Sequence, residues 1–160
     1  MAILQIVTYP NKLLEKKSKK VADFDERLWS LLDDMYDTMV EADGVGLAAP
    51  QVGILEQIAV IDAGDENGKI ELINPVLIEK RGNENGIEGC LSIPGIYGEV
   101  KRASFIKIKA QDRMGKAFIL EASGFLARVI QHEMDHLNGV LFTTKAAELF
   151  DEDELETIEG

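Results

Sequence analysis

The sequence predicts an α+β fold in which antiparallel sheets pack around a central helix. Short strand-like segments follow one another closely through the middle of the chain, and no helical segment lies between them, which favours antiparallel pairing. Two segments have helical periodicity, residues 21–42 and a second segment from Ser123 or Gly124 to Asn138-Gly139. The second of them carries the run His132-Glu133-Met134-Asp135-His136 and is the helix we expect at the centre.

The first predicted helix covers residues 21–42. Asp23, with Glu26 three residues later, is typical of a capping box at a helix start. Large apolar side chains recur at helical spacing and predict one buried stripe: Leu28, Leu31, Leu32, Met35 and Met39.

A stretch of small residues, 44–53, follows this helix. Its glycines suggest backbone that passes close to a neighbouring element or a ligand. The spacing does not match a dinucleotide-binding loop, and a phosphate-binding loop is excluded because no lysine stands at the required position. Gln51 is the one side chain here that offers both a hydrogen-bond donor and an acceptor.

The pattern in the middle of the chain predicts β structure. Residues 105–110 alternate apolar and basic, as in a strand with one face in water, and a turn at 113–116 returns the chain. The predicted strands are 57–62, 70–74, 76–80, 105–110 and 117–121.

Length and charge restrict the class of protein. A chain of 160 residues is one domain, and we assign 1–147 to a catalytic domain and 148–160 to an acidic tail. The net charge of −12 argues against nucleic-acid binding, which needs a basic patch. No apolar run approaches a membrane span, and a single cysteine cannot form an internal disulfide. We therefore expect a cytoplasmic protein.

The run from His132 to His136 is typical of a catalytic metal site. On a helix the two imidazoles lie one turn apart on the same face and can reach one ion. Glu133 is rotated by about 100° from His132, close enough to the metal to take a proton from a bound water without being a ligand. The chain has two histidines, and both are in this pattern. This pattern predicts metal-assisted hydrolysis.

The third protein ligand must be a cysteine or a carboxylate, because no third histidine exists. Cys90, the one cysteine, completes a Cys-His-His set. The alternative is a carboxylate of the acidic tail between Glu152 and Glu156, as in a metalloprotease with a downstream glutamate. A protein with a purely structural metal is a third possibility, but it needs a fourth ligand that the sequence does not supply.

Three motifs occur in the order Gly44-Val45-Gly46-Leu47-Ala48-Ala49-Pro50-Gln51, Glu88-Gly89-Cys90-Leu91-Ser92 and Gln131-His132-Glu133-Met134-Asp135-His136. Together they closely resemble the three signature motifs of the peptide deformylase family. The resemblance extends in element order and spacing to about Phe142. It implies hydrolysis of the formyl group of N-terminal N-formylmethionine on newly synthesised polypeptides, with release of formate.

The resemblance also assigns roles to individual residues. The metal ligands would be Cys90, His132 and His136. A metal-bound water would attack the formyl carbon with Glu133 as general base and acid, while Gln51 and the Leu91 N–H stabilise the oxyanion. The substrate would be bordered by Val45, Gly46, Gly89, Phe125 and Val129, with His132 beside the methionine pocket. Glu88 and Arg102 resemble a supporting ion pair.

The cofactor implied by the family is Fe(II), with Zn, Ni or Co as substitutes, and the affinity order of these metals alone would not select iron. The partners implied are N-formylmethionyl nascent peptides, which suggests proximity to the ribosome. Some members of the family carry a longer basic C-terminal helix that docks there, whereas this tail is acidic and would be repelled by ribosomal RNA. Tyr97 stands where some members have Arg or Lys, which would alter substrate-binding detail and not the chemistry.

Overall fold

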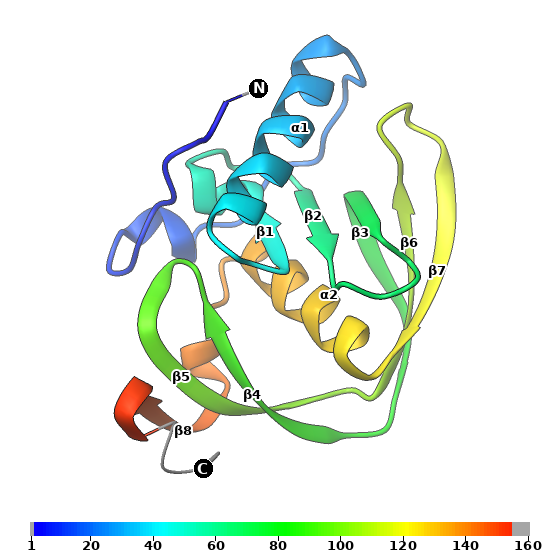
Figure 1. Cartoon of the computed structure of the whole chain (residues 1–160). Coiled ribbons are helices and arrows are strands. Elements are labelled where there is room, and N and C mark those ends of the chain that lie inside the picture. The colour runs from blue at the N-terminus through cyan, green and yellow to red at the C-terminus, as the bar shows by residue number, and fades with distance from the viewer. Residues whose placement is uncertain (1, 155–160) are drawn as a thin grey trace.

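The computed structural model describes residues 2–154, which form two antiparallel sheets and two main helices (Figure 1). The helices are α1 (Glu26–Glu41) and α2 (Gly124–Leu137). The five-stranded sheet has the order β1 (Gly46–Ala48), β2 (Ile58–Asp62), β3 (Lys69–Arg81), β6 (Phe105–Gln111) and β7 (Ala117–Ser123). The three-stranded sheet has the order β4 (Glu84–Cys90), β5 (Ile93–Arg102) and β8 (Ala146–Asp151).

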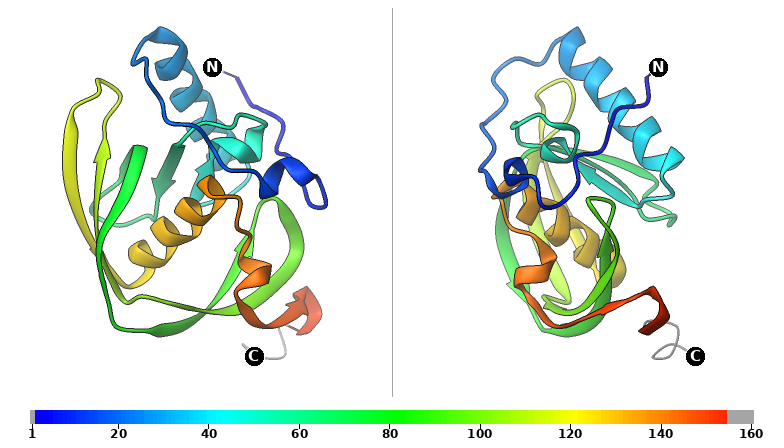
Figure 2. Two further views of the ribbon diagram at one scale, coloured as in Figure 1. Left: turned by 180° about the vertical axis from the view of Figure 1, so that it is seen from behind. Right: turned by 90° about the vertical axis from the view of Figure 1, so that its left-hand side faces the viewer.

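Helix α2 lies between the two sheets, as the views in Figures 1 and 2 show. Strand β2 explains how the five-stranded sheet holds both helices, since successive side chains of a strand point to opposite faces. Ile58 and Val60 belong to the apolar cluster of α1, whereas Ala59 and Ile61 belong to the cluster of α2. Both faces of the sheet are therefore buried here, and the predicted α+β arrangement around a central helix is confirmed.

The start of the first helix was predicted wrongly. Helix α1 begins at Glu26, and its N-cap is Asp25, whose side chain accepts a hydrogen bond from the Leu28 N–H. Val21 cannot join the helix because its N–H and its C=O are both bonded to the side chain of Asn74. A long-range contact thus decides a boundary that the local capping pattern placed too early.

The side chain of Asn74 joins the N-terminal segment to the five-stranded sheet through hydrogen bonds. It has a left-handed backbone, with φ 53°, which asparagine tolerates better than most residues. Its side chain donates to the Val21 carbonyl and to Gln111 Oε1, and accepts from the Val21 N–H. These contacts are buried or partly buried, so their loss leaves polar groups without partners.

We expect Asn74→Ala to lower the free energy of unfolding by about 3 kcal/mol, from the unpaired groups and the strained backbone together. Urea unfolding of the variant measures the loss. Asn83→Ala, at an exposed position before β4, is the matched control and should stay within about 0.5 kcal/mol of the parent. Equal losses of unfolding free energy in the two variants would contradict this role of the Asn74 hydrogen bonds.

The predicted strands correspond to β2, β3, β6 and β7, although β2 begins one residue later than predicted, at Ile58. Strand β3 continues through Pro75 with a register shift between Ile73 and Val76. Strands β1, β4, β5 and β8 were not predicted. Glycines and a proline interrupt the alternation of β4 and β5, which lowers their strand propensity. Strand β8 crosses the predicted domain boundary after residue 147, and its residues 146–151 pair with β5. No described helix has both the length and the apolar character needed to cross a membrane.

Candidate metal centre

Three potential metal ligands converge where β4 meets α2. Cys90 is the last residue of β4, and His132 and His136 lie one turn apart on α2. The Cys90 Sγ is 3.3 Å from His136 Nε2, and the ligand atoms of all three residues lie within 4.8 Å of one another. Among the described residues this is the one group of its kind. A thiolate and two imidazoles at this spacing fit a divalent metal.

Glu88 fixes the orientation of His132. The distance from His132 Nδ1 to Glu88 Oε1 is 2.9 Å, and because a carboxylate can only accept, Nδ1 donates and Nε2 is left to bind a metal. Burial raises the pKa of Glu88, but hydrogen bonds from Arg102 and His132 outweigh burial and hold that pKa well below its usual range. Glu88 is therefore a permanent anion, as this role requires.

Arg102 is the predicted partner of Glu88, and the structure confirms the pair as buried. Its Nη2 and Nε donate to the two carboxylate oxygens at 2.8 Å and 2.9 Å, and its Nη1 donates to Asp135 Oδ2 at 2.6 Å. Arg128 also donates to Glu88, and this contact was not predicted. The available signal was its spacing, because Arg128 lies four residues before His132 and so on the same face of α2 as the two histidines.

Gln51 lies beside Cys90 with a fixed orientation. Its Oε1 accepts from the Ala48 N–H at 2.9 Å, so the amide nitrogen faces the site. This Nε2 is 3.6 Å from Cys90 Sγ and donates to Ser92 Oγ at 3.1 Å. Burial lowers the pKa of His136, which also contacts Cys90, to about 3, and this keeps its imidazole neutral as a metal ligand must be.

Glu133 is buried and has a free oxygen. Among residues 2–154, no group hydrogen-bonds its Oε1. Burial raises the pKa of Glu133 to about 7. Gly46 leaves room for the other oxygen, because a Cβ on Gly46 would lie 2.5 Å from Oε2. A buried carboxyl that titrates near neutral pH is suited to moving a proton.

This raised pKa predicts a pH-dependent stability of the metal-free protein. Unfolded glutamate titrates at its ordinary 4.5 and the folded carboxyl at about 7, so the stability that Glu133 contributes is fully present below pH 4.5. It is lost as the pH rises through 7. The unfolding free energy of Glu133→Gln minus that of the parent should therefore increase by about 3 kcal/mol between pH 4.5 and pH 8. Denaturant titrations of chelator-treated proteins measure it, and a difference independent of pH would contradict the assignment.

A cavity of about 460 Å³ opens onto this group of residues. Its lining includes each predicted catalytic and substrate-binding residue: Val45, Gly46, Gln51, Gly89, Leu91, Phe125, Val129 and Glu133. Cys90 and His132 also line it. The structure thus brings together residues from β1, β4 and α2 that are far apart in the sequence, and their individual roles are considered below.

The alternative ligand from the acidic tail finds no support in the described part of the chain. Glu152 borders the cavity, but the described metal-binding group contains no tail residue. Glu156 lies outside the described residues.

The fold and the site define a metal-binding hydrolase, with a histidine pair on a central helix and a third ligand from a sheet. Comparison with known proteins is more specific. The family profile described as polypeptide deformylase matches residues 3–151. Peptide deformylase 1 of Bacillus subtilis is 58% identical over 160 residues and covers 100% of both chains. That of Bacillus cereus is 60% identical over 156 residues, which are 98% of this chain and 100% of the relative.

The crystal structure of peptide deformylase from Thermotoga maritima superposes with a TM-score of 0.89 at 42% identity, covering 92% of this chain and 100% of that one. The chain therefore belongs to the peptide deformylase family, the enzymes that remove N-formyl groups from peptides.

Proposed function

We propose that the chain hydrolyses the formyl group of N-terminal N-formylmethionine on newly synthesised polypeptides and releases formate. The observation that carries the proposal is that Cys90, His132 and His136 come together beside the cavity that Glu133 lines, where the buried Oε1 of Glu133 has no hydrogen-bond partner among the described residues. Membership of the deformylase family supplies the reaction class.

The metal ligands and Glu133 have separate tasks in this reaction. A divalent metal held by Cys90, His132 and His136 supplies Lewis acidity and lowers the pKa of a water. Glu133 takes a proton from the attacking water as the new C–O bond forms. It returns that proton to the peptide nitrogen as the C–N bond breaks, so the products are formate and a free amine.

The formyl oxygen gains negative charge during the attack and needs hydrogen-bond donors. Gln51 is suited to donate, since the Ala48 N–H holds its Oε1 and turns Nε2 toward the site. The Leu91 N–H follows the metal ligand Cys90 directly and is the second proposed donor. Gly46 and Gly89 leave the substrate backbone free of side chains on these edges of the cavity.

The methionine side chain is assigned to the apolar part of the cavity. Val45 and Phe125 line it and are 39% and 56% exposed, so a bound methionine side chain would cover apolar surface there. Val129 and the ring of His132 border the same space. The expected substrate therefore presents a flexible apolar side chain next to its formyl group.

The proposed native metal is Fe(II), with Zn, Ni or Co as substitutes that the same ligand set accepts. A thiolate beside a redox-active metal also makes Cys90 sensitive to oxidation. The substrate appears where ribosomes make it, which supports a cytoplasmic location and proximity to the ribosome without a basic docking segment.

The test is formate release from a formyl-Met peptide by protein prepared anaerobically with Fe(II). Activity on this peptide, and none on the acetyl-Met analogue, is the expected result. Full metal occupancy without formate release would contradict the substrate and leave a hydrolase of a different amide.

A further inference from the structure

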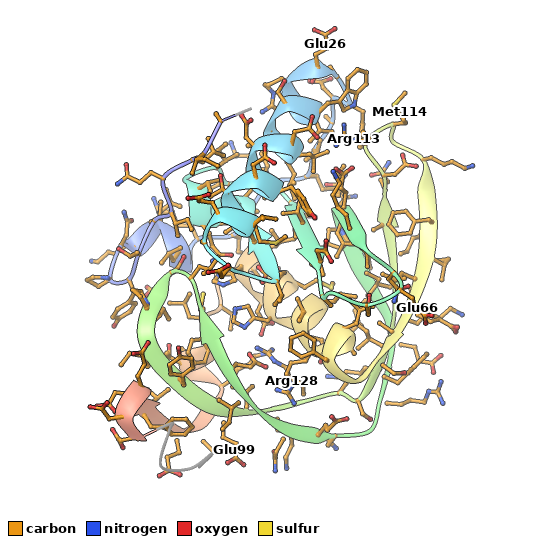
Figure 3. The ribbon with its side chains drawn as sticks, in the orientation of Figure 1. Glu26, Glu66, Glu99, Arg113, Met114 and Arg128 are labelled. Atoms are coloured by element: carbon orange, nitrogen blue, oxygen red, sulfur yellow. The ribbon has the colours of Figure 1, made fainter. Side chains whose placement is uncertain are left out.

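Arg128 is a buried charge beside the metal centre, and the proposed reaction assigns it no task. It lies on α2, between that helix and β4 (Figure 3), and is 8% exposed. Its Nη1 donates to Glu88 Oε2 at 2.7 Å and to the Val100 carbonyl at 2.9 Å, and its Nη2 donates to the Glu84 carbonyl at 2.6 Å. One guanidinium therefore joins α2 to β4 and β5.

The two oxygens of Glu88 contact two residues of α2 that are one turn apart. Oε1 accepts from His132 Nδ1, and Oε2 accepts from Arg128 Nη1. Arg102 also bonds both oxygens, but it is on β5 and holds the carboxylate relative to the sheet. Arg128 is the second point that fixes the plane of the carboxylate relative to the helix that carries the metal ligands.

Strand β4 is shaped to receive this guanidinium. A Cβ on Gly86 would lie 2.8 Å from both Cζ and Nε of Arg128, so the guanidinium rests against the bare backbone there. Glu88 is paired with both Arg102 and Arg128, whereas Asp135 is paired with Arg102 and Lys145. Without Arg128, the buried carboxylate of Glu88 would lose one of its two guanidinium partners, and two backbone carbonyls would lose a donor.

We propose that Arg128 is a positioning residue for the metal centre. It locks Glu88 against α2, and Glu88 in turn holds the His132 ring with Nε2 directed at the metal. The proposal extends the metal site on which the proposed function rests. Its first readouts are metal binding and spectroscopy, which do not depend on the substrate.

The decisive variant is Arg128→Met, which keeps a long side chain and removes the charge and the donors. With Co(II) as the probe metal, we expect the dissociation constant from chelator competition to rise about tenfold, and the visible absorption bands of bound Co(II) to shift. Arg128→Lys restores the charge and one donor, and should recover most of the affinity. Gly86→Ala pushes the guanidinium away and should weaken Co(II) binding in the same direction.

Arg113→Met is the matched control. Arg113 also bridges two carboxylates, of Glu71 and Asp33, but near α1 and away from the cavity (Figure 3). Its replacement should lower the melting temperature while Co(II) affinity stays within twofold of the parent.

An Arg128→Met protein that loses thermal stability as Arg113→Met does, yet keeps the parent's Co(II) affinity and spectrum, would overturn the proposal and leave Arg128 a purely structural cation. If Arg128→Met changed only the KM for a formyl-Met peptide, the proposal would also be overturned, and Arg128 would be only a residue that lines the substrate cavity. If the parent releases no formate, the Co(II) readouts still decide the matter, so the two failures are distinguishable.

Discussion

Replacing Glu133 by alanine should abolish formate release while the metal stays bound. The carboxyl is buried, its Oε1 has no hydrogen-bond partner among the described residues, and burial raises its pKa to about 7, so it can both accept and return a proton near neutral pH. It is not part of the Cys-His-His group. Loss of the general base and acid should lower kcat by roughly 10³-fold or more, toward the upper end of what such groups contribute.

The measurement is formate release from a formyl-Met peptide, with metal content determined on the same samples. Glu41→Ala, at the exposed end of α1, is the control and should keep the activity of the parent. If Glu133→Ala retained a tenth or more of the activity with its metal bound, another group would have to carry the proton. If the metal were lost, the assignment of Glu133 as a non-ligand would be wrong.

The sequence was sufficient for the part of the site that depends on local geometry. Helical spacing alone predicts that His132 and His136 share a face, and the structure confirms it. The third metal ligand could not be derived from helical spacing, because Cys90 lies on a strand. The glycines of that strand interrupt the alternation of apolar and polar residues by which strands are predicted. The available donor types left Cys90 or a carboxylate of the tail as the third ligand, and the resemblance of three ordered motifs favoured Cys90.

Contacts between distant segments account for what was missed. Val21 is kept out of α1 by Asn74, 53 residues away in the sequence. Arg128 shares a face of α2 with the two histidines, but its role depends on Glu88, 40 residues before it in the sequence. Local propensity contains no information on such pairs, since they exist only once the sheets have closed around the helix.

The choice between Cys90 and the acidic tail as the source of the third ligand can be settled by one pair of variants. Cys90→Ser removes the thiolate and leaves a hydroxyl that does not ionise near neutral pH, so the metal loses one of its three protein ligands. A bound structural metal is worth about 10–16 kcal/mol over four ligands, and one ligand should then be worth about 3 kcal/mol. The affinity should fall by roughly 100-fold or more, with activity lost at ordinary metal concentrations.

The companion variant ends the chain after Asp151, so that β8 keeps its pairing with β5 and residues 152–160 are absent. It should keep its metal, its fold and most of its activity, because no tail residue belongs to the described metal-binding group and the family profile also ends at residue 151. Glu152 borders the cavity, so a change in KM is the effect we expect from its loss. The opposite result, metal lost on truncation and kept in Cys90→Ser, would require a carboxylate ligand from the tail. Chelator competition on the two variants therefore decides between a deformylase centre and a protease-like one, since the two sites share the histidine pair and differ only in the third ligand.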